Sequence, residues 1–73
     1  MDAEYIRKKT CIIIRKNGEY LQGGILWSTD LRWSISPYCA WQTRDMEKAR
    51  RIARKTGGIM VLFNPVVNQM KIL

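Results

Sequence analysis

The first third of the chain has the pattern of a β-hairpin. Residues 5–16 contain a β-branched run that favours a strand. Asn17-Gly18 follows, and this dipeptide suits a type I′ turn because both residues tolerate a positive φ. Residues 19–22 then return antiparallel, and a two-residue turn fixes their register. The register places two pairs opposite each other: Lys16 with Glu19, and Arg15 with Tyr20.

The two faces of this predicted hairpin differ in polarity. One face is apolar and is expected to join the core; it holds Ile12, Ile14 and Leu21. The other face is amphipathic; it holds Cys11, Ile13, Arg15, Tyr20 and Gln22. If this second face is open, Arg15, Tyr20 and Gln22 offer hydrogen-bonding or stacking groups to a partner.

The middle of the chain predicts a bend followed by a third strand. Gly23-Gly24 indicates a bulge, residues 25–27 continue the strand or begin the next, and residues 28–30 suit a turn. Residues 31–36 alternate between apolar and polar, which is the period of a half-buried strand. Ser36-Pro37 favours a short helical turn, because Ser suits the N-cap and Pro the first helical position.

Residues 44–56 predict the one clear helix. Thr43 is a suitable N-cap, and Gly57 is a natural left-handed stop. The stripe that is expected to dock on the sheet holds Met46, Ala49, Ile52, Ala53 and Thr56. At about 100° per residue, five cations spread over roughly 160° of the opposite side: Lys48, Arg50, Arg51, Arg54 and Lys55.

The end of the chain predicts two more strands. Residues 59–63 are a continuous apolar run, which is typical of a central strand. Asn64-Pro65 interrupts the run, and residues 70–73 can pair back as an edge strand. The predicted order is therefore β-β-β-α-β-β. We expect a single α+β domain over residues 1–73, with one antiparallel sheet and one amphipathic helix packed on one face.

Missing residue types argue against an enzyme. The chain has no His, so a His-based catalytic base and an imidazole metal ligand are both excluded. The two cysteines fit no zinc or redox spacing, and the two Gly-Gly pairs lack the pattern of a phosphate-binding loop. We therefore expect a non-enzymatic protein that has no catalytic residue, no metal and no cofactor.

Charge is the unusual feature of the composition. The 73 residues include 13 Lys and Arg against 6 Asp and Glu, which gives a formal net charge of +7. Such an excess favours an anionic partner. No apolar run approaches the roughly 20 residues that cross a bilayer, and the N-terminus lacks the apolar region of a secretory signal. We expect a cytoplasmic protein without a membrane partner.

Nucleic acid is the anionic partner that this charge favours most, because Lys and Arg neutralise phosphates and release counterions. The candidate binding residues lie on the helix face and the first hairpin: Lys48, Arg50, Arg51, Arg54, Lys55, Arg15, Lys16, Tyr20 and Gln22. On the same predicted hairpin, the basic cluster also includes Arg7, Lys8 and Lys9. The alternative interpretation is that any surface helix needs a solvated face, which Lys and Arg commonly supply.

Short motifs follow one another along the chain in this order: Asn17-Gly18, Trp33-Ser34, Ala40-Trp41, Ala49 with Ala53, Gly57-Gly58 and Asn64-Pro65. In this order they resemble small uncharacterised proteins encoded in bacterial phages and prophages, over about residues 12–68. The resemblance implies a fold and a phage or prophage origin, and it brings over no catalytic or binding residue. A looser similarity of topology is to the arm-type DNA-binding domains of phage integrases, which place a sheet in the major groove.

Two other roles fit the same sequence. The first is a protein-interaction module, such as a phage-encoded inhibitor of a host enzyme, because aromatic residues and Arg dominate binding hot spots. The aromatic residues concerned are Trp27, Trp33, Tyr38 and Trp41. The second is a homodimer formed through the last strand, if that strand is an exposed edge.

Overall fold

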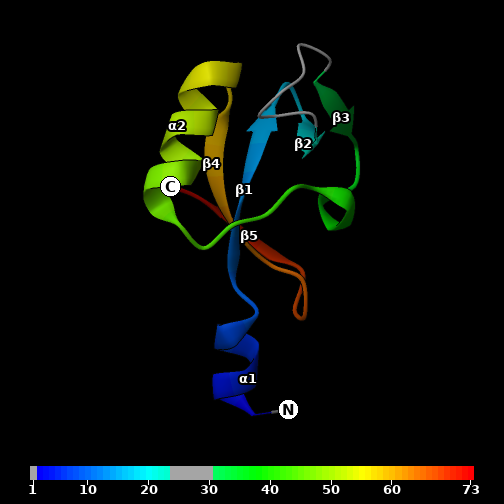
Figure 1. The fold of residues 1–73 in the computed structure, drawn as a ribbon. Coiled ribbons are helices and arrows are strands. Elements are labelled where there is room, and N and C mark those ends of the chain that lie inside the picture. The colour runs from blue at the N-terminus through cyan, green and yellow to red at the C-terminus, as the bar shows by residue number, and fades with distance from the viewer. Residues whose placement is uncertain (1, 24–30) are drawn as a thin grey trace.

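The computed structural model describes residues 2–23 and 31–73 (Figure 1). Its helices are α1 (Ala3–Lys8), the short 3₁₀ helix η1 (Pro37–Cys39) and α2 (Met46–Thr56). Its strands are β1 (Cys11–Lys16), β2 (Glu19–Gly23), β3 (Arg32–Ser34), β4 (Ile59–Asn64) and β5 (Gln69–Ile72). The interpretations of Gly24, residues 25–27 and residues 28–30 concern positions outside the described residues.

The strands form one antiparallel sheet in the order β3-β2-β1-β4-β5. The α+β class and the predicted order of strands and long helix are therefore confirmed. Arg15 pairs with Tyr20 and Lys16 with Glu19, as the two-residue turn requires. The sheet has its edges at β3 and β5, so the predicted edge position of the last strand is confirmed. None of the helices found within residues 2–23 and 31–73 meets the length and hydropathy that a bilayer span requires.

Both faces of the sheet are covered at their centre. On one face, α2 packs on β1 and β4, and the buried cluster there contains Ile14, Leu21, Ile52 and Ala53. The opposite face has a cluster of its own: Cys11, Ile13, Tyr20, Ala40, Val61 and Phe63. The η1 segment covers this second cluster, and the ring of Tyr38 meets that of Phe63 edge-on at 5.4 Å between centroids. The second hairpin face, a candidate open surface by sequence, therefore contributes Cys11, Ile13 and Tyr20 to the core, while Gln22 on the same face is exposed.

The start of the chain is helical, so the prediction of a strand from residue 5 is wrong there. Asp2 caps α1, because its carboxylate accepts a hydrogen bond from the Glu4 backbone N–H at 3.0 Å. Lys8 lies one turn after Glu4, and their charged groups approach to 3.8 Å. These local interactions favour a helix. The strand begins at Cys11, where the chain enters the sheet.

The long helix begins two residues later than predicted. Asp45, rather than Thr43, is its N-cap, and one carboxylate oxygen of Asp45 accepts from the backbone N–H groups of Glu47 and Lys48. Gly57 ends the helix with a φ of 77°, as expected. Gly58 is needed for a different reason: a Cβ atom there would lie 2.6 Å from a methyl carbon of Ile14. The chain can pass from α2 into β4 this tightly only because residue 58 has no side chain.

Candidate nucleic-acid interface

The outer face of α2 is fixed in place by the stripe on its inner face. Ala49, Ile52, Ala53 and Thr56 are all buried against the sheet. The Thr56 hydroxyl donates to the Ile52 carbonyl at 2.9 Å, so its polar atom is satisfied inside the core. Met46, which the sequence assigned to this stripe, is exposed in the first turn. The opposite side of a firmly docked helix must then face solvent.

The five predicted cations of α2 all lie on that exposed side: Lys48, Arg50, Arg51, Arg54 and Lys55. Arg50 pairs with Glu47 at 2.8 Å, and Lys8 pairs with Glu4 at 3.8 Å. Asp45 is engaged in capping the helix. Within α2 itself, Glu47 is the one acidic residue against these five cations.

The first hairpin reaches this surface through Lys16. Its ammonium group donates to the Thr56 carbonyl at 3.0 Å, which ties the hairpin turn to the C-terminal end of α2. A cation there also meets the negative end of the helix dipole. The hollow beside it has a volume of about 370 Å³, and it is lined by Arg15, Lys16, Asn17, Gly18, Gly57 and Ile59. Lys16 therefore joins the helix cations at one end of the molecule.

Of the other three predicted hairpin residues, Tyr20 and Gln22 do not join the cations of α2, and Arg15 only lines the hollow beside Gly57. Tyr20 is only 6% exposed, and its hydroxyl donates to the Met70 sulfur at 3.4 Å. The role of Tyr20 as a stacking ring is thus corrected: it is a core residue. Arg15 is half-buried with its guanidinium carbon 6.0 Å from the Tyr20 ring centre, and Gln22 is exposed on β2. Since side chains alternate along strands, Arg15 and Tyr20 lie on the sheet face away from α2.

The remaining basic cluster also needs correction. Arg7 and Lys8 belong to α1 and Lys9 is its C-cap, so none of the three is on the hairpin. The guanidinium of Arg44 donates to the Lys8 carbonyl, which links the chain just before α2 to the end of α1. Figure 1 shows α1 extending from one end of the sheet, away from the body of α2.

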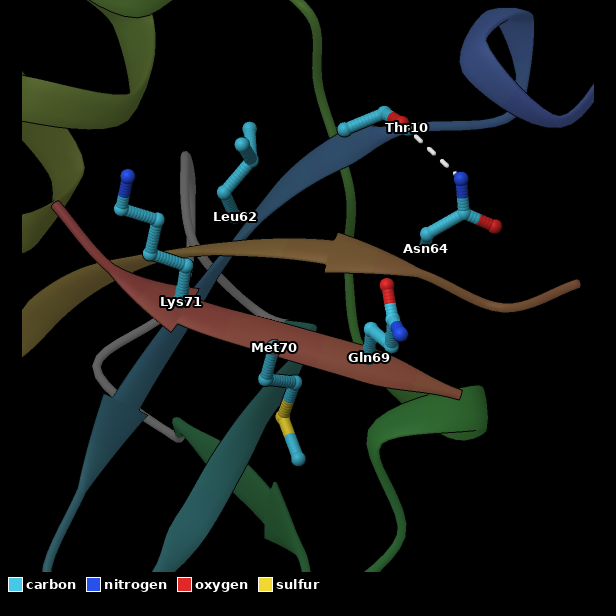
Figure 2. A pocket seen from close by; sticks show the side chains of 6 residues that line it. All are labelled: Thr10, Leu62, Asn64, Gln69, Met70 and Lys71. Carbon is cyan, nitrogen blue, oxygen red and sulfur yellow. Dashed lines mark hydrogen bonds between the residues drawn. The ribbon is translucent and has the colours of Figure 1, made fainter. Parts of the chain in front are cut away.

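Lys71 is a cation on the α2 side that the sequence analysis did not include among the candidate binding residues. Lys71 pairs with Leu62 across β4 and β5, so both side chains share the sheet face that α2 covers. Figure 2 shows these two side chains on one side of β5 and Met70 on the other. The alternation of side chains along the last strand was the sequence signal that could have assigned Lys71 to this face. The adjoining hollow of about 500 Å³ is lined by Thr10, Leu62, Asn64, Gln69, Met70 and Lys71.

The Asn64 side chain at the rim of this hollow serves the fold. The Asn64 amide nitrogen donates to the Thr10 hydroxyl at 3.0 Å (Figure 2) and to the Ile6 carbonyl at 2.6 Å. The Asn64 side-chain oxygen accepts from the Val66 N–H at 3.0 Å. Asn64 therefore fastens α1 and the β4–β5 turn, and it has no unused polar atom to direct at a ligand.

Comparisons with protein-family models, with curated proteins and with solved structures give no match. The site must therefore be interpreted from its own geometry and charge.

Proposed function

We propose that this protein binds the phosphate backbone of nucleic acid through the outer face of α2. The observation that carries the proposal is the array of exposed Lys and Arg side chains on a helix whose inner face is buried. Lys16 extends the array at the C-terminal end of α2. A fixed row of cations can follow a row of phosphates, and the release of counterions supplies the affinity.

The chemistry of the face favours a duplex over a single strand. Proteins that hold single strands combine cations with aromatic platforms for the bases. In the described ranges, the most exposed aromatic rings are Tyr5 at 48% and Tyr38 at 55%, and they belong to α1 and η1 rather than to α2. Duplex DNA carries about one charge per 1.7 Å of its axis, which is the denser target for cations alone. We expect binding with little dependence on sequence.

A matched pair of triple variants tests the location of the binding surface. R50Q/R51Q/R54Q removes three charges from α2, and R7Q/K8Q/K9Q removes three from the α1 region. Binding of a 20-base-pair duplex is followed by fluorescence anisotropy between 50 and 200 mM salt. The α2 variant should lower the log–log salt slope by about 2.7, since each lost phosphate contact contributes about 0.9. The α1 variant should keep most of the wild-type slope.

Two results would contradict the proposal. One is a wild-type protein that fails to bind duplex DNA or RNA at 50 mM salt. The other is an equal loss in both triple variants, because net charge alone would then account for the binding. Circular dichroism and thermal melting of each variant show whether the fold is retained, so a loss of binding can be assigned to the surface.

The alternative of a protein partner is favoured by one observation around η1. Ile35 is 83% exposed and Tyr38 is 55% exposed, and they flank the start of η1. Trp33 and Trp41, by contrast, are half-buried against the α2-side core. Docking through Ile35 and Tyr38 would respond weakly to salt, so the same titration separates the two functions.

A further inference from the structure

The outer face of α2 contains a small hollow with an unusual lining. Its volume is about 110 Å³, and its walls are Glu47, Arg50, Arg51 and Arg54. The three arginines follow Glu47 by three, four and seven positions, so all four side chains share one side of the helix. A single carboxylate thus lies among three guanidinium groups.

We propose that this hollow is a phosphate subsite, and that the Glu47 carboxylate holds the position of the phosphate in the free protein. The proposal rests on the proposed function and names the part of α2 where one backbone phosphate docks. A guanidinium offers a planar fork of N–H donors that fits the oxygens of a phosphate or a carboxylate. Glu47 Oε1 already accepts from Arg50 Nη1 at 2.8 Å.

The Glu47–Arg50 ion pair competes with an incoming phosphate, but it is exposed enough for the phosphate to displace it. The side chains of Arg50 and Glu47 are 48% and 79% exposed, so water and salt weaken their attraction. An incoming phosphate must displace the carboxylate from Arg50 and then lies close to its negative charge. Both effects lower the affinity of the wild-type face. Removal of the carboxylate charge should therefore strengthen binding at this position.

The chain supplies a matched control on α1. Glu4 pairs with Lys8 at 3.8 Å, and their side chains are 68% and 71% exposed. Glu4→Gln and Glu47→Gln change the net charge by the same amount, and each removes one exposed ion pair. Only Glu47→Gln opens the arginine hollow. The difference between the two variants isolates the local effect from the general gain in positive charge.

The first experiment measures duplex binding of the wild type and both variants. Glu47→Gln should lower Kd about threefold to tenfold, because the phosphate no longer has to displace the carboxylate from Arg50 or lie beside its negative charge. Glu4→Gln should change Kd less than about twofold, since a distant exposed charge is screened. If the wild type binds and the two variants behave alike, the subsite is wrong while the proposed function stands. If the wild type does not bind, the proposed function fails.

A second measurement tests the hollow without nucleic acid. Inorganic phosphate is titrated into ¹⁵N-labelled wild type and Glu47→Gln, and the arginine Nε–Hε signals are followed by NMR. The signals of Arg50, Arg51 and Arg54 should shift more than that of Arg7, and they should shift at lower phosphate concentration in Glu47→Gln. Equal shifts for all four arginines in both proteins would overturn the subsite, even if the protein binds a duplex.

Discussion

The two α-helices of this protein are built from the same local signals. Each begins at an Asp N-cap, carries a Glu in its first turn, and has basic residues in its last turn. Each also contains one exposed ion pair between a Glu and a cation one turn later. By capping, dipole and charge pattern alone, α1 and α2 are equivalent.

They differ in what they bury. Four residues of α2 are buried, whereas α1 has none. Two hydrogen bonds to backbone carbonyls of α1 connect it to the rest of the molecule: one from Asn64 to Ile6 and one from Arg44 to Lys8. Positive charge is therefore common to both helices, but only α2 holds its charges in a fixed array. Packing, rather than charge, therefore distinguishes the candidate binding helix from α1.

The largest expected effect comes from removing core volume under each helix. Ile52 is 4% exposed and packs in the cluster with Ile14 and Leu21, so Ile52→Ala should lower the free energy of unfolding by about 3 kcal/mol. Ile6 is half-buried on α1, and Ile6→Ala should cost less than about 1 kcal/mol. Urea denaturation followed by circular dichroism measures both. Equal costs would show that α1 belongs to the cooperative core, and the comparison would fail.

A smaller effect is expected from the two N-caps. Asp45→Ala leaves the N–H groups of Glu47 and Lys48 without their acceptor and should destabilise the fold by about 1 kcal/mol. Asp2→Ala should leave the global stability unchanged, because α1 can fray without opening the sheet. Asp45→Asn is the control, since Asn also caps and should recover most of the loss. A global loss from Asp2→Ala equal to that from Asp45→Ala would contradict this difference.

The same contrast explains what the sequence could predict. The apolar positions of α2 repeat with helical period and oppose a polar face, so the helix and its exposed cations followed directly. In the six residues of α1 only Ile6 is half-buried and the rest are exposed, so the segment carries no periodic signal. Residues 5–8 lie just before the β-branched run, so the sequence pattern assigned them to the same predicted strand. Only the cap at Asp2 and the charge order along residues 3–8 marked the helix.

The candidate site also contains residues that the sequence could predict and residues that it could not. The cations of α2 were predictable because a docked stripe fixes the opposite face. The environment of Tyr20 was not, because the residues that cover it come from far along the chain. Tyr20 clusters with Ala40, and its hydroxyl bonds to Met70. Alternation along a strand assigns a residue to a face, but it does not show which distant segment covers that face.

The smallest expected effect of a substitution is at the junction between α1 and β1, where the rate of thiol labelling can be measured. Cys11 is 4% exposed at the start of β1, and its thiol donates to the Phe63 carbonyl at 3.5 Å. Cys39 is an exposed, free cysteine. Burial raises the pKa of the Cys11 thiol above its ordinary value of 9.0, and the charge of Arg44 opposes that rise. Because labelling needs both access to the sulfur and the thiolate form, buried Cys11 should label far more slowly than exposed Cys39 at pH 8.

The labelling rate of Cys11 then reports whether the strand opens with the helix. Asp2→Ala should leave the protection of Cys11 unchanged, because fraying of α1 does not expose the cluster that contains it. Because burial holds the folded-state pKa of the Cys11 thiol above its unfolded-state pKa, the thiol contributes to the stability of the fold while it is protonated. This contribution is fully present below the unfolded-state pKa and is lost as the pH rises through the folded-state pKa. Protection should therefore decline only in alkaline solution. If Cys11 in Asp2→Ala labels as fast as Cys39 at pH 8, then α1 and the start of β1 open together. In that case α1 helps to protect the core cluster around Cys11, although none of its own residues is fully buried.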